Sequence, residues 1–451
     1  MAWSDDVRRS LTPPRPTGNF QVTLRLIFVA RDPTESSGEE VLSLTSRHAA
    51  IFPGVGAQHT GMGKELFDRF PIYRGTVEEA SDVLRMDFSK LCFSAEHRKE
   101  LNRQEASQLG TFVTSVAMYR VMTEELGLEF AVHAGHSLGE YSALCAAGAV
   151  SFVDGLELVR RRGAVIRDAA SKVDGTMMWV LNLPPQVVES ACARVARTGG
   201  RVSVSAYDAP LQLAISGPRD DLLAVAQELE ARGAVVYPLG MEGPYHSELM
   251  RAAADEMATL LKSFDIVEPS APVLSTVTAE PHPGGDGSRE LLAEQLVAPV
   301  RWLDVQRRLV AQGVGGALEV GPGNVLRFLL EKTTKSVTGW SVAQHPDAAR
   351  LREVMSVGPA DRADVVRGCL RVAASTPTRR QDPDGLEIVA RAQRELIALD
   401  SRAREGAELG NEDVESALTW VRRILEAKGL TGADGQGRIN RVLGGRARPA
   451  A

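Results

Sequence analysis

The sequence predicts an α/β fold in which a large domain carries a small inserted subdomain and is followed by a helical extension. Three observations lead to this prediction. Short apolar stretches run directly into glycine-rich turns and then into amphipathic stretches, which is the pattern of strand, loop and helix. Between about residues 174 and 242 the elements instead follow the order β-α-β-β-α-β of a ferredoxin-like subdomain. After residue 346 this pattern gives way to a proline-containing linker and charged helices.

The composition is that of an ordinary globular protein and excludes several classes of function. The 451 residues are 44% hydrophobic and 24% charged, which is enough for two or three domains with sizeable cores. The formal net charge of -6 leaves no basic excess for phosphates, so we expect no nucleic-acid partner. No apolar stretch approaches the length of a membrane span, so we expect no membrane association. The four cysteines are scattered without a Cys-x-x-Cys pair, which predicts a cytoplasmic protein with no metal site.

The large domain is expected over residues 49–346, after an N-terminal extension at 1–48 that we expect to be partly disordered. Its first strand, 49–52, runs into the glycine-rich loop 53–58, where backbone amides can come close to a ligand. The remaining expected elements are helices at 66–84, 105–126, 152–170 and 302–312, with strands at 130–132, 273–276 and 317–320.

The inserted subdomain interrupts this domain at about residues 174–242. Its expected strands are 176–181, 202–206, 212–216 and 234–239, and its expected helices are 184–196 and 219–233. Beyond the domain, residues 347–451 predict a linker at 377–384, one or two charged helices at 386–428 and a flexible tail at 429–451.

The sequence Gly135-His136-Ser137-Leu138-Gly139 lies between an apolar stretch and a helix-forming stretch. Strand, Gly-x-Ser-x-Gly and helix is the setting in which a serine hydroxyl is exposed on a sharp turn. The glycines are needed because a side chain would clash as the strand folds back into the helix. A chain with 41 glycines can also produce this pattern in an ordinary tight turn, so the motif alone leaves both interpretations open.

Four motifs then follow one another in a specific order: Phe-Pro-Gly-Val-Gly-Ala-Gln at 52–58, Gly-His-Ser-Leu-Gly-Glu-Tyr at 135–141, Tyr-His-Ser-Glu-Leu-Met at 245–250 and Glu-Val-Gly-Pro-Gly at 319–323. Together they resemble the malonyl-CoA:acyl-carrier-protein transacylase family, including freestanding acyltransferases of polyketide synthesis. The resemblance covers residues 49–346. It implies a large α/β-hydrolase-like domain with the inserted ferredoxin-like subdomain.

The resemblance implies a catalytic role for Ser137 as nucleophile and for His246 as its base, with the main-chain carbonyl of Gln295 orienting the histidine. A serine hydroxyl needs such a base, and an imidazole with a pKa near neutrality can accept the proton and return it. A histidine in a polar turn is the alternative interpretation of His246 taken alone. The implied oxyanion hole uses the backbone amides of Leu138 and Val55, the latter standing where the family usually has glutamine.

The resemblance also implies a site for a free carboxylate. Arg162 matches the family residue that holds the carboxylate of malonyl groups, since a guanidinium fork suits that anion. Gln108, Gln58 and Tyr245 match residues that line or flank the substrate pocket. Asp208 departs from the family pattern, which has asparagine there, and a carboxylate would repel a malonyl group unless it points away or pairs with a cation.

These residues lead to an acyltransferase hypothesis. A malonyl, or related dicarboxylic, group passes from CoA through a serine-bound acyl-enzyme to the phosphopantetheine thiol of an acyl carrier protein, in polyketide or fatty acid biosynthesis. The expected partners are the acyl-CoA and the carrier protein, with no bound cofactor or metal. Two alternatives stay open: an acyl hydrolase that releases acyl groups from carrier proteins, and a non-catalytic subunit that docks them.

Overall fold

The computed structural model describes residues 47–343, 362–376, 383–430, 438–439 and 442. Except for the two residues that begin β1, the N-terminal extension expected at 1–48 lies outside these residues, as does most of the expected tail at 429–451. The large domain is built on a five-stranded, all-parallel sheet with the order β7-β2-β1-β8-β9. These strands are β1 (Arg47–Phe52), β2 (Val132–Gly135), β7 (Val273–Leu274), β8 (Val314–Glu319) and β9 (Thr338–Ser341).

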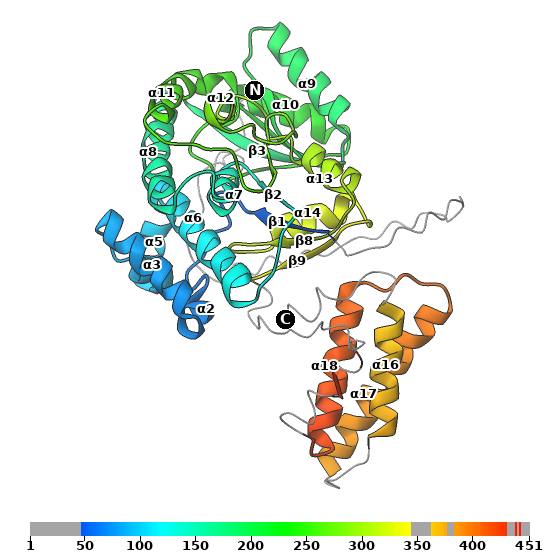
Figure 1. Cartoon of the computed structure of the whole chain (residues 1–451). Helices are drawn as coiled ribbons and strands as arrows, with labels where there is room; N and C mark the ends of the chain where they lie inside the picture. The colour runs from blue at the N-terminus through cyan, green and yellow to red at the C-terminus, as the bar shows by residue number, and fades with distance from the viewer. Residues whose placement is uncertain (1–46, 344–361, 377–382, 431–437, 440–441, 443–451) are drawn as a thin grey trace.

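Helices lie beside this sheet, with α6, α7 and α8 on one side and α13 and α14 on the other in Figure 1. The α-helices of the large domain are α2 (Lys64–Arg69), α3 (Pro71–Leu84), α4 (Phe88–Phe93), α5 (Arg98–Leu101), α6 (Gln104–Arg120), α7 (Gly139–Ala146), α8 (Phe152–Ala170), α11 (Arg251–Leu261), α12 (Gly285–Glu294), α13 (Trp302–Ala311) and α14 (Val325–Thr333).

Two expected helices differ from the observed ones. The helix expected at 66–84 is broken into α2 and α3, because Pro71 lacks an amide hydrogen and forces Phe70 into an extended conformation. The helix expected at 105–126 begins as α6 and ends in a π-helical turn, Val121–Glu125.

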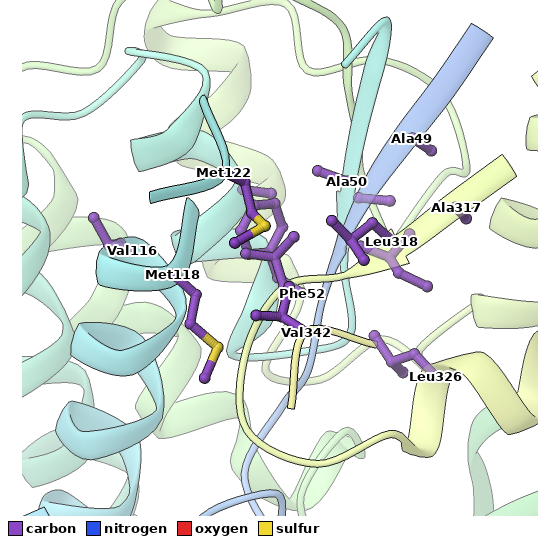
Figure 2. Close-up of a cluster of buried hydrophobic side chains, with 14 of the residues drawn as sticks. Ala49, Ala50, Phe52, Val116, Met118, Met122, Ala317, Leu318, Leu326 and Val342 are labelled. Atoms are coloured by element: carbon purple, nitrogen blue, oxygen red, sulfur yellow. The ribbon is translucent and has the colours of Figure 1, made fainter. Parts of the chain in front are cut away.

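The core of the large domain follows from the parallel sheet, which is covered on both faces and therefore has continuous apolar strands. Ala49, Ala50 and Phe52 of β1 are fully buried beside Leu318 of β8. Figure 2 shows these side chains packed together with others from α6 and the π-helical turn, from β8, from α14 and from the end of β9 (Val116, Met118, Met122, Ala317, Leu326 and Val342). The sheet therefore holds the carboxyl ends of β1, β2 and β8 in a rigid frame.

The inserted subdomain has the ferredoxin-like order predicted from the sequence. Its antiparallel sheet runs β4-β5-β3-β6, and its own core lies between one face of that sheet and the two helices. The alternation of a strand sends Met178 and Val180 into that core, while Met177 and Trp179 face the large domain. The elements are β3 (Gly175–Leu181), α9 (Pro185–Arg197), β4 (Ser203–Ala209), β5 (Gln212–Pro218), α10 (Arg219–Glu230) and β6 (Val235–Pro238).

The C-terminal region contains three described helices, α16 (Arg362–Ser375), α17 (Pro383–Arg404) and α18 (Asn411–Ala427), which pack against one another (Figure 1). The prediction of one or two charged helices at 386–428 corresponds to α17 and α18. Their contact is largely apolar, with Leu396, Val414, Leu418 and Val421 buried, and an ion pair joins Arg402 of α17 to Asp413 of α18. The domain boundaries stay a prediction: an extension at 1–48, a domain at 49–346 and a C-terminal region at 347–451.

Candidate active site

Ser137 lies on a sharp turn between β2 and α7, and its backbone adopts a left-handed conformation with φ of 51°. A Cβ at Gly135 would lie 1.9 Å from the carbonyl carbon of Gly139, and one at Gly139 would lie 2.0 Å from the carbonyl oxygen of Phe52. Both positions therefore require glycine. The His136 amide also donates to that Phe52 carbonyl at 2.9 Å, which ties the turn to the end of β1.

The serine is paired with the predicted base. The Oγ of Ser137 lies 2.8 Å from Nε2 of His246, and Nδ1 of His246 lies 2.8 Å from the main-chain oxygen of Gln295. A carbonyl can only accept, so Nδ1 carries the proton and Nε2 is free to accept the serine hydroxyl. His246 itself has a positive φ of 57°, a strained conformation that this surrounding structure maintains.

Burial is the main influence on the titration of His246 and lowers its pKa to about 4. The Gln295 carbonyl acts in the opposite direction by accepting the Nδ1–H, and the charges of Arg162 and His136 lower the pKa further. The imidazole is consequently neutral at physiological pH. It can therefore act as a general base without first losing a proton to solvent.

The two amides predicted for the oxyanion hole belong to residues on either side of the serine turn. Val55 lines the cavity above the serine, and Leu138 stands at the N-terminal end of α7. In the described part of the chain, neither amide donates to a protein acceptor. The loop of Val55 lies tightly on the serine turn, since a Cβ at Gly54 would be 2.7 Å from the His136 carbonyl oxygen. Free amides at this position suit a developing negative charge.

Arg162 extends from α8 into the same cavity and is almost completely buried. Its Nη1 donates to Oε1 of Gln108 at 2.5 Å, and its guanidinium lies 5.1 Å from the ring centre of Tyr141. Its Nε has no partner among the described residues. A buried guanidinium with a neutral partner and an unused donor fits an anionic ligand.

The other residues predicted to bind the substrate differ in whether they line the cavity. Tyr245 lines the cavity, whereas Gln108 reaches it only through its contact with Arg162. Gln58 is not among the residues that line the cavity, and its role in substrate binding stays a prediction. Its Oε1 accepts from the Gly56 amide at 2.8 Å, so it holds the shape of the loop that carries Val55.

The sequence reasoning missed one pair in the cavity wall. His136 Nε2 donates to Oδ1 of Asp208 at 2.9 Å, and the main-chain oxygen of Asp208 accepts from Gln306 Nε2 at 2.8 Å. The carboxylate that was expected to repel a malonyl group thus has a hydrogen-bond donor. His136 stands inside the serine motif and Asp208 on β4, so no local pattern could have indicated their contact.

The cavity has a volume of about 260 Å³ and lies between the large domain and the inner face of the small sheet. Apart from the residues already described, most of its lining is apolar: Ile166, Met177, Trp179, Leu239, Met241, Leu296, Leu326 and Leu329. The described residues contain no cluster of three or more metal-ligating side chains. None of the described helices is both long and apolar enough to cross a membrane.

Known proteins resemble this chain over the region that contains these residues. The family described as "Acyl transferase domain" matches residues 50–357. A malonyl CoA-acyl carrier protein transacylase of Bacillus subtilis is 36% identical over 305 residues, covering 68% of this chain and 76% of that protein. The Escherichia coli K12 protein of the same name is 34% identical, over 67% of this chain and 97% of its own.

A solved structure is also similar. It is described as a type II polyketide synthase acyl-carrier protein in complex with its malonyl-transacylase. The match has 34% identity and a TM-score of 0.65, and it covers 68% of this chain and 99% of that one. The similarity therefore extends over the α/β domain with its inserted subdomain, where the site described above lies.

Proposed function

This chain belongs to the acyl transferase family, and on that premise we propose that it transfers a malonyl group from CoA to an acyl carrier protein. A related dicarboxylic acyl group would satisfy the same site. The reaction serves polyketide or fatty acid biosynthesis. The observation that carries the proposal is the hydrogen-bonded pair of Ser137 and His246 in one cavity with a buried, incompletely paired Arg162.

The first half-reaction forms the acyl-enzyme. The Ser137 oxygen attacks the thioester carbonyl carbon while its proton passes to Nε2 of His246. The amides of Leu138 and Val55 stabilise the oxyanion, which is worth about 3–4 kcal/mol for one such donor in other enzymes. The carbon–sulfur bond then breaks, and the imidazolium returns the proton to the departing CoA sulfur.

The second half-reaction reverses these steps with a different thiol. The phosphopantetheine sulfur of the carrier protein loses its proton to His246 and attacks the acyl-serine ester. The proton then returns to Ser137 as the ester bond breaks. This chemistry needs no bound cofactor or metal ion, since CoA and the carrier protein are both substrates. We assign the reaction to the cytoplasm, because all four cysteines are free thiols, which suits a reducing compartment.

Arg162 determines which acyl groups enter. A malonyl carboxylate would give the buried guanidinium an anionic partner in the cavity, whereas an acetyl group would leave its charge without one. The His136–Asp208 hydrogen bond lies in the wall of the same cavity, and its donor reduces the free negative charge that the substrate carboxylate meets.

Mass spectrometry of the intact protein after incubation with malonyl-CoA tests the proposal. We expect an adduct of malonyl mass on Ser137 that transfers to a carrier protein, and no adduct on the Ser137→Ala variant. An adduct that persists on that variant would contradict the assignment. If the adduct decays to free malonate as fast with the carrier protein as without it, the hydrolase alternative is correct. If the wild type never acquires an adduct, the docking alternative is favoured.

A further inference from the structure

A second buried cluster lies directly beneath the serine and its base, at the start of α7. Its centre is Glu140, whose side chain is completely inaccessible to solvent. Oε2 of Glu140 accepts from Gln295 Nε2 at 2.8 Å, from the Thr276 amide at 3.0 Å and from the Thr276 hydroxyl at 2.6 Å. Oε1 accepts from His282 Nε2 at 2.6 Å. Four donors from three separate segments thus converge on one carboxylate.

These donors keep the carboxylate ionised. Burial is the largest single influence on Glu140 and raises its pKa, but the contacts with His282 and Thr276 together outweigh it and leave the pKa lowered. A carboxylate that was merely tolerated in the core would become protonated instead. The site therefore contains a fixed negative charge whose hydrogen bonds are stronger than those of a neutral acceptor.

His282 also has a hydrogen-bond partner for its other ring nitrogen. Its Nδ1 lies 3.2 Å from the hydroxyl of Ser288, and that hydroxyl oxygen already accepts from the Gly284 amide. The Ser288 hydroxyl can consequently donate to Nδ1, which favours the tautomer with its proton on Nε2, facing Glu140. In that tautomer the Nε2–H supplies the donor that Glu140 requires.

Gln295 links this cluster to the chemistry. Its side-chain Nε2 contacts Glu140 and also lies 3.2 Å from the main-chain oxygen of Ser137. Its main-chain oxygen accepts the Nδ1–H of His246. One residue therefore joins the nucleophile's turn, the base and the buried carboxylate, and the position of its carbonyl depends on where its side chain is anchored.

We infer that Glu140, supported by His282, is a positioning residue that holds the side chain of Gln295 and thereby sets the Gln295 carbonyl against His246. It touches neither the substrate nor the reacting atoms. The role rests on the proposed function of Ser137 as nucleophile. Because misplacing a catalytic group by about 1 Å can cost 100-fold in rate, loss of this anchor should act on the chemical step rather than on substrate binding.

The variant that tests this most directly is Gln295→Leu, which keeps the main-chain carbonyl and removes only the side-chain anchor. We expect the saturating acylation rate constant with malonyl-CoA to fall about 10- to 100-fold, with the half-saturating concentration unchanged. The control is Thr76→Val, which removes another buried side-chain donor to a main-chain oxygen, that of Ile72 at 2.8 Å, outside the residues that line the cavity. It should lose comparable stability without a similar loss of the rate constant.

A second pair of variants separates the role of His282 from general packing. His282→Gln keeps a side-chain donor toward Glu140 and should retain most of the rate, whereas His282→Leu should lose as much as Gln295→Leu. Glu140→Gln should have the largest effect, because an amide presents a donor to groups that are themselves donors. Circular dichroism and thermal unfolding establish which variants are folded before their rates are compared.

A fluorophosphonate that labels activated serines provides the readout that does not depend on the acyl donor. If folded Gln295→Leu reacts with this probe at the wild-type rate, the anchoring role is wrong. Equal labelling rates for His282→Gln and His282→Leu would show that His282 takes no part in anchoring Gln295. If the probe labels the wild type quickly but malonyl-CoA does not, the proposed substrate fails while the positioning role is still tested by the same variants.

Discussion

The floor and the roof of the cavity are built by different means. The floor is backbone: the serine turn and the first loop are pressed together so closely that Gly54, Gly135 and Gly139 have no room for a Cβ. The roof is made of side chains from the inner face of the small sheet, among them Met177, Trp179 and Asp208. The floor therefore admits almost no substitution, whereas the roof can change one side chain at a time without disturbing the sheet beneath it.

This difference divides the chemistry between the two regions. The Ser137–His246 pair and the amides proposed for the oxyanion hole come from the large domain, whose sheet has five parallel strands. The small subdomain has its own separate core and contributes only to the shape and polarity of the pocket. Changes in the floor should abolish the reaction, and changes in the roof should alter which acyl groups react. The following predictions test that division, beginning with the largest expected effect.

Gly139→Ala should disrupt the close packing of the serine turn on the first loop. Its Cβ would meet backbone atoms at 2.0 Å, which neither a rotamer change nor a small shift can relieve. We expect a loss of about 3 kcal/mol or more in the free energy of unfolding and no measurable acylation. Gly75→Ala is the matched control, because Gly75 lies within α3 with open space at its Cβ. It should stabilise the protein by about 0.5–1 kcal/mol and leave activity unchanged. Normal acylation by folded Gly139→Ala would contradict the closely packed floor.

Arg162→Ala should lower kcat/KM for malonyl-CoA about 100-fold or more, since it removes the partner of a desolvated carboxylate. The rate with acetyl-CoA should change far less. Arg161→Ala is the control on the same helix; Arg161 is half-exposed and paired with Glu157, and its loss should leave both rates unchanged. An equal fall with the two acyl donors would make Arg162 a structural residue.

Lowering the pH should slow the reaction of Ser137, because protonated His246 can no longer accept the serine proton. Its pKa in the folded protein is about 4, so Ser137 labelling should stay constant from pH 7 to about 5.5 and fall tenfold per unit below about pH 4. Unfolded histidine binds protons more readily, so His246 should also destabilise the fold as the pH drops from about 6.5 toward 4. Rapid-mixing measurements with the fluorophosphonate give the labelling rate, and circular dichroism at each pH shows whether the protein is still folded. Together they distinguish protonation of His246 from unfolding. A labelling rate that already halves near pH 6.5 would contradict the buried, neutral imidazole.

Asp208→Asn changes a side chain of the roof and should have the smallest kinetic effect of these changes. The amide oxygen can still accept from His136, while the negative charge is removed from the cavity wall. We expect KM for malonyl-CoA to fall about twofold to fivefold at low salt, with little change in kcat, because the substrate carboxylate meets less repulsion. Steady-state kinetics at two ionic strengths measure this. A large fall in kcat would instead place Asp208 in the support of the serine turn through His136.

The sequence predicted the floor well because its chemistry depends on local backbone geometry. A serine between two glycines at a strand end can be recognised in five residues, and the order of the four motifs pointed to His246 across more than 100 intervening residues. The ferredoxin-like order of the insert was equally visible, since alternating and helical periodicities are properties of single segments. The break at Pro71 was available from the sequence and was missed in favour of a continuous apolar pattern.

The contacts that only the folded chain decided are those between polar groups far apart in sequence. Nothing local indicates that Asp208 would meet His136 or that Glu140 would meet His282. Burial likewise sets the pKa of His246, and burial is a property of everything packed around the ring. The sequence by itself therefore predicted which side chains the proposed reaction uses, because the strand, turn and helix around Ser137 are encoded locally. Tertiary structure decided how those atoms are held and charged, because that depends on which distant groups the packing brings within hydrogen-bond distance.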